Sequence, residues 1–322
     1  PNTNPIPDSS SDLVFLKNAA KGQGTSLYPL GALTVGSAGE SLAELFDMKN
    51  AGAVGFYDFE RPMESSNLLK IALQYCQNFD GLVYSYPMDV KIAGKGIVNE
   101  GHSSTTLGLK GIPSLAEELQ IARDLYILEY TGGKLHLPTI SSAGSVKLIA
   151  EAKKKGLDVS CSVPVHNLWL TDEVLGEYDT NCKLMPPLRG KDDIKALIKG
   201  VKDDTIDFVT SNHIPMDVEQ KRIEFDNAAY GSLGLESVFG ILNQNFGAEA
   251  AVALLLKGRE RYGLDRPRIQ EGEQDCLTLF ETETEYVLDK SHLNSTSKNC
   301  AFLGNTMKGS VYGIIHNNKA II

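Results

Sequence analysis

The chain of 322 residues lacks the features that mark membrane, nucleic-acid-binding and disulfide-rich proteins. No apolar run in the sequence approaches the ~20 residues needed to cross a bilayer. Acidic residues outnumber basic ones by 41 to 31, and the net charge of −10 argues against phosphate-rich partners. The five cysteines are scattered and form no CxxC pair, which is typical of reduced thiols. We therefore expect a cytoplasmic protein with no membrane or nucleic-acid partner.

Short apolar runs alternate along the chain with longer segments of helical periodicity. We predict strands at residues 53–57, 81–86, 134–137, 157–162 and 206–210, and helices at 63–78, 114–130, 145–155 and 192–202. In the helix at 114–130, Ser114 and Glu117 have the spacing of a capping box. Repeated strand–helix alternation indicates a parallel sheet with crossover helices, and this number of units favours a (β/α)8 TIM barrel.

Two long polar stretches, 88–113 and 211–232, interrupt this alternation and are expected to lie over the functional face of the barrel. From about residue 269 the chain becomes rich in β-branched residues and turns, without helical periodicity. We therefore predict two domains, a barrel over 1–268 and a small C-terminal β-sandwich module over 269–322.

Several motifs occur in an order that carries a resemblance. They include Pro1-Asn2-Thr3-Asn4-Pro5, Asn99-Glu100-Gly101, Leu107-Gly108-Leu109-Lys110-Gly111-Ile112-Pro113, Lys183-Leu184-Met185-Pro186-Pro187-Leu188-Arg189 and Gly234-Leu235-Glu236-Ser237. Each is short, but together they resemble the dihydroorotases of the amidohydrolase superfamily, of the type found in multifunctional complexes, over nearly the whole chain. Within the fourth run we expect Arg189 to fix a loop as an ion-pair partner.

The resemblance implies a metal-dependent (β/α)8 barrel that opens or closes the cyclic amide of dihydroorotate in pyrimidine biosynthesis. In such sites the metal generates hydroxide and polarises the amide carbonyl. The family's first ligands come from a His-x-His motif on the first barrel strand. None of the six histidines forms that motif, and the sequence begins just downstream of the expected strand. We therefore expect the first strand to be missing from this chain.

The remaining metal positions of the family carry unusual residues. The two further histidine ligands fall on Tyr86 and Thr139, and the catalytic aspartate falls on Asn212. An amide cannot act as a general base, and Tyr, Thr and Asn seldom form a zinc site. Asp58 is the one metal-ligand candidate that survives, although Glu60 stands where a glycine is usual.

Two positions match the substrate contacts of the family. Asn2 corresponds to the residue that contacts the substrate carboxylate, and His213 to a substrate-contacting histidine. His136 and His166 are expected to be structural, because buried histidines usually find hydrogen-bond partners.

The leading hypothesis is a degenerate dihydroorotase, a pseudoenzyme without a cofactor that has a scaffold or regulatory role. The family implies a partner, because in several bacteria an inactive dihydroorotase-like chain assembles with aspartate carbamoyltransferase. We also expect a homo-oligomer.

Two alternatives remain open. One is an active zinc-dependent cyclic amidohydrolase of the dihydroorotase, allantoinase or hydantoinase type, which hydrolyses a cyclic C–N bond. The other is a metal-free binder of dihydroorotate or carbamoyl aspartate that uses Asn2, His213 and the loop 211–232.

Overall fold

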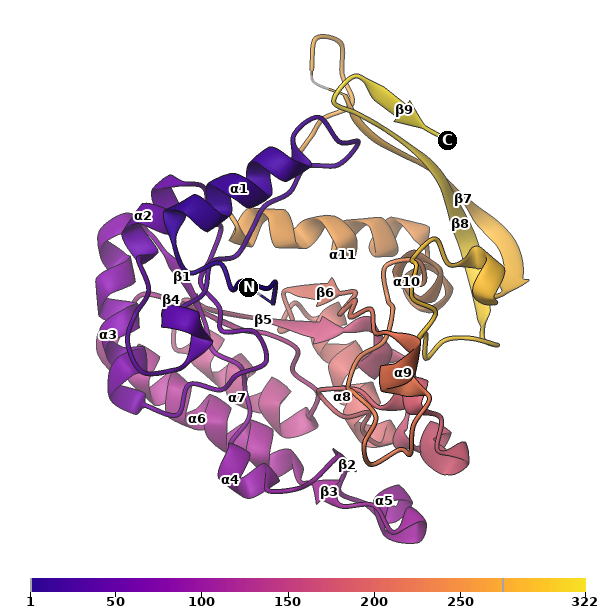
Figure 1. Ribbon diagram of the computed structural model, residues 1–322, viewed down its shortest axis with the longest axis horizontal. Helices are drawn as coiled ribbons and strands as arrows, with labels where there is room; N and C mark the ends of the chain where they lie inside the picture. The colour runs from indigo at the N-terminus through magenta and orange to yellow at the C-terminus, as the bar shows by residue number, and fades with distance from the viewer. Residues whose placement is uncertain (1, 274) are drawn as a thin grey trace.

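A parallel sheet forms the centre of the computed structural model, which describes residues 2–273 and 275–322 (Figure 1). Pro1 of the opening motif lies outside these residues. The hydrogen-bonded order of the sheet is β1 (Leu82–Tyr84), β4 (Lys134–Leu137), β5 (Val159–Pro164) and β6 (Phe208–Thr210). Single parallel bridges, from Val83 to Phe56 and from Phe56 to Gly31, extend the array beyond β1. Every pairing in this series is parallel, as the alternation predicts.

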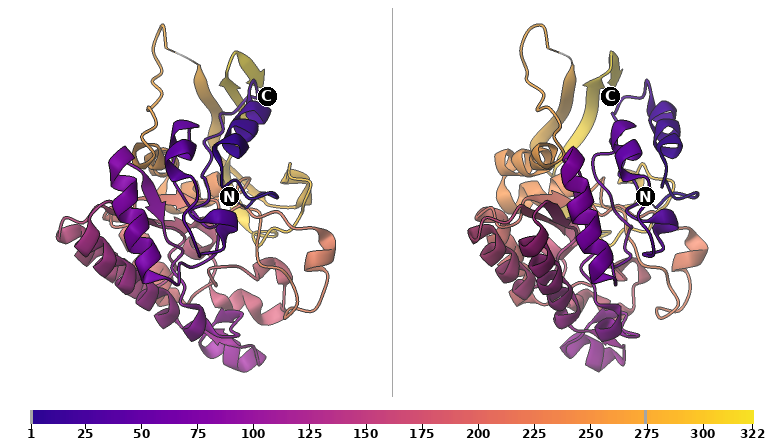
Figure 2. Two further views of the ribbon diagram at one scale, coloured as in Figure 1. Left: turned by 60° about the vertical axis from the view of Figure 1, so that its left-hand side comes forward. Right: turned by 90° about the vertical axis from the view of Figure 1, so that its left-hand side faces the viewer.

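Helices pack along one side of this sheet in chain order (Figures 1 and 2). They are α3 (Ser66–Cys76), α6 (Ser114–Thr131), α7 (Ala143–Lys154) and α8 (Lys191–Lys202), and each contacts the next. On α3 the buried residues Leu69, Ala72, Leu73 and Cys76 follow the spacing of one helical face. This face contributes to the hydrophobic core beneath β1 and β4.

The strands and helices predicted between residues 63 and 210 are confirmed to within three residues at each end. The strand predicted at 53–57 instead contributes only the two bridges of Phe56. The capping box predicted at Ser114 is wrong, because Pro113 is the N-cap residue and no side chain caps the helix. The Glu117 carboxylate is used elsewhere, as described below.

The two long stretches contain short elements. Residues 88–113 fold into α4 (Val90–Ala93), β2 (Val98–Asn99), α5 (His102–Leu107) and β3 (Gly111–Ile112), and 211–232 contain α9 (Val218–Lys221). Since these stretches follow β1 and β6, both begin at the carboxyl end of the sheet.

The remaining α-helices of the described residues lie around the sheet. They are α1 (Ser10–Ala20), α2 (Leu45–Asn50), α10 (Val238–Phe246) and α11 (Ala248–Arg261). None of the helices in the described ranges has the length and hydropathy of a bilayer span.

The C-terminal residues form an antiparallel sheet of β7 (Cys276–Val287), β8 (Thr306–His316) and β9 (Lys319–Ile321). Its far end reaches the N-terminal part of the chain, where His316 shares a 2.9 Å hydrogen bond with Ser26. At its other end, α10 packs against β8. A β-rich C-terminal segment is therefore confirmed, while the domain boundary at residue 268 stays a prediction.

A buried ion pair connects α6 to the loops at the carboxyl end of the sheet. Arg189 Nη2 lies 3.6 Å from Glu117 Oε2, and each side chain is 1% exposed. Glu117 also accepts hydrogen bonds from the backbone N–H groups of Ser141 and Ser142 and from the hydroxyl of Ser145, at 2.8, 3.0 and 2.6 Å. The carboxylate therefore holds the turn between β4 and α7.

Arg189 reaches two other loops from the same position. Its guanidinium donates to Ser141 Oγ at 3.0 Å, to Asn99 Oδ1 at 2.9 Å and to the Ile112 carbonyl at 3.0 Å. The predicted role of Arg189 as a loop-fixing ion-pair partner is confirmed.

We expect Arg189→Met to lower the free energy of unfolding by about 3–5 kcal/mol, because it leaves the Glu117 carboxylate buried without its cation. Urea titration would measure the loss. Lys191→Met is the matched control, since its ion pair with Glu173 is exposed and such pairs contribute about 0–1 kcal/mol. Equal urea midpoints for Arg189→Met and the wild type would contradict this role.

Candidate functional site

The candidate site lies where the parallel strands end. β1, β4, β5 and β6 are neighbours, and the residues two positions beyond their last residues are Tyr86, Thr139, His166 and Asn212. Because the carboxyl ends of parallel strands meet at one edge, the fold brings these four positions to the same face. At three of them, Tyr86, Thr139 and Asn212, the family resemblance predicts two histidine ligands and the catalytic aspartate.

Tyr86 is 4% exposed and belongs to a buried cluster that includes Tyr57, Tyr84 and Met88. Its hydroxyl has no hydrogen-bond partner in the part of the chain that the structure describes. Burial raises the pKa of this phenol well above its usual value, so the hydroxyl stays neutral. A neutral, desolvated phenol is a poor replacement for an imidazole ligand.

Thr139 and Asn212 both adopt left-handed backbone conformations, with φ of 53° and 40°. The buried hydroxyl of Thr139 also lacks a partner among the described residues. The Asn212 side-chain amide donates to the Met185 carbonyl at 3.2 Å. At position 212 the side chain therefore joins the loop after β6 to the loop before Arg189.

Asp58, the surviving metal-ligand candidate, is 4% exposed and already accepts several hydrogen bonds. Its Oδ1 receives the backbone N–H groups of Leu33 and Thr34 at 2.9 and 3.0 Å, and its Oδ2 receives the Thr34 hydroxyl at 2.5 Å. These bonds fix the segment that follows the Gly31 bridge. The structure thus gives Asp58 a loop-holding contact, while its metal role stays a prediction.

Glu60, in the same loop, has a φ of 52°, the left-handed region that favours glycine. Burial raises the pKa of its carboxyl to about 7. Its backbone N–H donates to the Tyr57 hydroxyl at 3.1 Å. The loop therefore keeps a backbone shape suited to glycine while carrying a poorly solvated carboxyl group.

The two histidines expected to be structural, His136 and His166, are both buried and hydrogen-bonded. The His136 ring is hydrogen-bonded to Ser160 at 2.8 Å and to Ser162 at 3.1 Å, and it stacks on Phe208. The His166 ring is bonded to the Leu233 carbonyl at 3.3 Å. Burial lowers the pKa of both, that of His166 to about 4, so both rings are neutral near pH 7.

The two predicted substrate contacts have different surroundings in the structure. His213 Nδ1 accepts the backbone N–H groups of Gly234 and Leu235 at 3.3 and 3.2 Å and lies 3.7 Å from a Glu236 oxygen. Asn2 is exposed and lines a hollow of about 320 Å³ that also contains Phe59. Their substrate roles remain predictions.

The residues at the strand ends do not fit a zinc ion. A zinc site needs several N, O or S ligands that converge on one point, and catalytic sites usually have three protein ligands. Within residues 2–273 and 275–322 no group of three or more His, Cys, Asp or Glu side chains could hold a metal ion. No metal-dependent step can therefore be assigned to Tyr86, Thr139 or Asn212.

Comparison with known proteins decides the family. A family model described as "Dihydro-orotase-like" matches residues 1–145. The chain is 36% identical to the dihydroorotase of Acetivibrio thermocellus over 330 aligned positions, which cover all of this chain and 78% of that protein. It is 38% identical to the dihydroorotase of a Thermoanaerobacter species, over 97% of this chain and 74% of that protein. The chain belongs to the dihydroorotase family.

Solved structures show the fold of this dihydroorotase homologue. The L-hydantoinase (dihydropyrimidinase) of Arthrobacter aurescens superposes with a TM-score of 0.79 at 20% identity, covering 97% of this chain and 74% of that one. The dihydropyrimidinase of Brevibacillus agri superposes with a TM-score of 0.69, covering 81% and 60%. These neighbours are TIM-barrel amidohydrolases, so the predicted barrel class is confirmed.

Sequence reasoning missed the full extent of the Glu117 network. Glu117 was placed on the helix predicted at 114–130, but its spacing from Ser114 favoured a local cap. The run Ser141-Ser142 beside the barrel strand is the signal that could have pointed to it, because several hydroxyl and N–H donors there need an acceptor.

We expect Tyr86→Phe in this dihydroorotase homologue to leave stability unchanged or to raise it by up to about 1 kcal/mol, because it removes a buried hydroxyl without a partner. Tyr84→Phe is the control. It removes the hydrogen bond between the Tyr84 and Tyr262 hydroxyls and should cost about 1 kcal/mol. Thermal unfolding of both variants measures the difference. A Tyr86→Phe loss as large as that of Tyr84→Phe would show that the hydroxyl has a bound partner.

Proposed function

We propose that this dihydroorotase homologue is a non-catalytic, cytoplasmic protein of pyrimidine biosynthesis that acts as a scaffold or regulator of aspartate carbamoyltransferase. The observation that carries the proposal is the state of Tyr86. A position that should bind metal holds a buried, neutral phenol instead. Metal-dependent hydrolysis of a cyclic amide needs a bound metal to generate hydroxide near neutral pH.

Asn212 supports the same proposal through proton transfer. The family's reaction needs a carboxylate there to accept and return a proton, and a side-chain amide has no such basicity. In the structure the Asn212 amide donates to the Met185 carbonyl, a contact that holds two loops together. Loss of both the metal ligand and the base removes two independent requirements of the chemistry.

An active zinc-dependent cyclic amidohydrolase, of the dihydroorotase, allantoinase or hydantoinase type, is the second candidate. Identity of 36% with proteins named dihydroorotase favours it, as does the carboxylate of Asp58. In this candidate zinc would be held by Asp58 together with an N-terminal His-x-His motif that this sequence does not contain and with unconventional ligands.

An exposed apolar stripe on α6 supports the proposal of a protein partner. The exposed apolar and aromatic side chains of α6 follow one helical stripe, with Tyr126 and Tyr130 exposed by 73% and 78%. Leu115 and Leu119 continue the stripe toward the start of the helix. Exposed apolar patches of this kind mark protein interaction sites.

Metal analysis separates the two candidate functions. We expect the full-length protein, purified from zinc-supplemented medium, to hold well below one zinc per chain by elemental mass spectrometry. It should also show no dihydroorotase turnover that a chelator abolishes. A dihydroorotase of known metal content, purified in the same way, is the control. One or more tightly held ions per chain together with chelator-sensitive turnover would reject the non-catalytic role.

The partner is tested by co-purification with aspartate carbamoyltransferase from the same organism. We expect wild-type chain to retain the transcarbamoylase, and Tyr126→Glu/Tyr130→Glu to release it, because two carboxylates replace exposed aromatic surface. Phe15→Glu, at an exposed position on α1, is the matched control and should retain it. Failure of the wild type to retain transcarbamoylase at low and high salt would reject this partner.

A further inference from the structure

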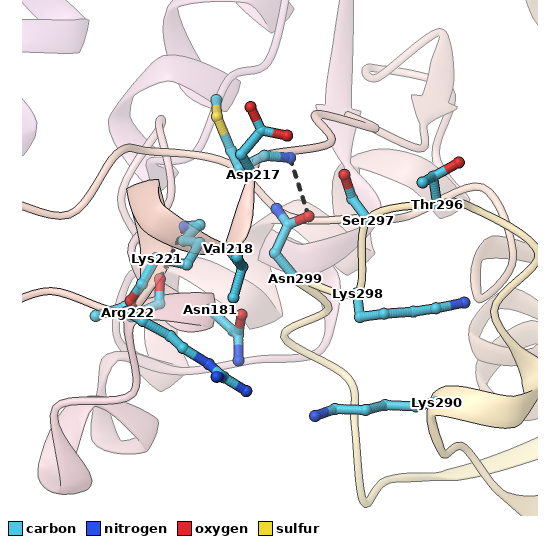
Figure 3. A pocket seen from close by; sticks show the side chains of 12 residues that line it. Asn181, Asp217, Val218, Lys221, Arg222, Lys290, Thr296, Ser297, Lys298 and Asn299 are labelled. Carbon is cyan, nitrogen blue, oxygen red and sulfur yellow. Dashed lines mark hydrogen bonds between the residues drawn. The ribbon is translucent and has the colours of Figure 1, made fainter.

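A cavity of about 410 Å³ lies between the loop after β6 and the C-terminal segment (Figure 3). Residues of α9 line one side of the cavity, and residues between 290 and 299 line the other. Four of its lining residues are cationic, against a single acidic residue, Asp217; they are Lys221, Arg222, Lys290 and Lys298. A concentration of positive charge in a chain with a net charge of −10 needs a local explanation.

The wall of the cavity contains a buried lysine, on which the charge of Asp179 acts without forming an ion pair within the described residues. Lys221 is 6% exposed and donates to the carbonyls of Thr180 and Ala229 at 2.9 and 2.7 Å. Among the described residues it forms no ion pair. Burial first, and then the positive charge of Lys183, lower the pKa of Lys221 to about 8. An anion in the cavity would offset the unfavourable free energy of the buried positive charge.

Two exposed cations complete the arrangement. In Figure 3, Arg222 and Lys290 extend toward one another from opposite sides of the cavity, and the Asn181 amide lies on the Arg222 side. Neither forms an ion pair within the described part of the chain. The carboxylate of Asp217 points away from both, so it does not neutralise them.

Lys298 plays a different part. Its ammonium group donates to the Leu293 carbonyl at 2.6 Å and extends away from Lys290 in Figure 3. It therefore adds to the positive potential of the cavity without facing the same point. A concave site lined by one sign of charge concentrates ions of the opposite sign.

We propose that this cavity binds a phosphorylated small molecule, with Arg222 and Lys290 as the anion-binding side chains. The planar guanidinium of Arg222 matches the geometry of phosphate oxygens, and a lysine ammonium adds a second charge. The cavity volume lies in the range of small-molecule sites and exceeds the needs of a lone phosphate group. Met216 and Val218 offer apolar surface to the remainder of the ligand.

This site is separate from the residues at the strand ends. Its lining includes none of Tyr86, Thr139 and Asn212. Binding of the phosphorylated ligand therefore depends on neither the loss nor the presence of hydrolase activity, and the two proposals can fail independently.

Calorimetric titration of the full-length protein with pyrophosphate, in low-salt buffer near pH 7, tests the site. We expect saturable binding of one pyrophosphate per chain. Arg222→Gln/Lys290→Gln should weaken it about 100-fold, or tenfold for each charge-assisted contact removed. Both side chains are exposed, so the substitutions leave the core intact.

The matched control is Lys91→Gln/Arg266→Gln, which removes the same net charge from exposed positions outside the cavity. This variant should bind pyrophosphate within about twofold of the wild type, because distant surface charges are largely screened. The proposal is overturned if the wild type shows no saturable binding. Equal weakening in both double variants, or none in the cavity variant, would also overturn it.

Discussion

The buried pair of Arg189 and Glu117 is the contact on which the carboxyl face of this barrel depends. Two opposite charges removed from water are tolerated only when further hydrogen bonds satisfy them. Here the donors to the carboxylate come from the turn after β4, and the acceptors for the guanidinium come from the long stretch after β1. Loops separated widely in sequence are thereby fixed relative to one another.

Much of this architecture could be predicted from the sequence because its signals are local. The strand at 134–137 alternates polar and apolar residues, and the helix at 192–202 has a clear polar and apolar face, so both were predicted close to their observed bounds. The strand at 53–57 was overestimated, because its pairing rests on Phe56 alone. The short elements between residues 88 and 113 were missed, because their stability comes from tertiary contacts such as that of Asn99 with Arg189.

For the candidate site, too, the sequence predicted the local features and not the long-range contacts. The sequence identified Tyr86, Thr139 and Asn212 as the residues at the family's metal-ligand and catalytic positions, because the motifs around them are preserved. It could not give their surroundings. Within the described residues the Tyr86 and Thr139 hydroxyls have no hydrogen-bond partner and Asn212 donates to the Met185 carbonyl, and both results depend on residues distant in the chain. The cationic cavity was equally hidden, since Arg222 and Lys290 are 68 positions apart and neither stands in a motif.

The proposed metal-free state of the barrel mouth accounts for the nature of the three substitutions through electrostatics. A carboxylate at position 212 would there be partly removed from water without a cation, and unpaired buried charge is costly. Asparagine has nearly the same shape, carries no charge and donates to the Met185 carbonyl. Tyr86 likewise fills its position with aromatic surface that packs in the cluster of Tyr57 and Tyr84. Neutral side chains at these three positions are thus compatible with the fold that the Arg189–Glu117 pair organises, and the uncharged amide at position 212 is the change that bears most directly on proton transfer.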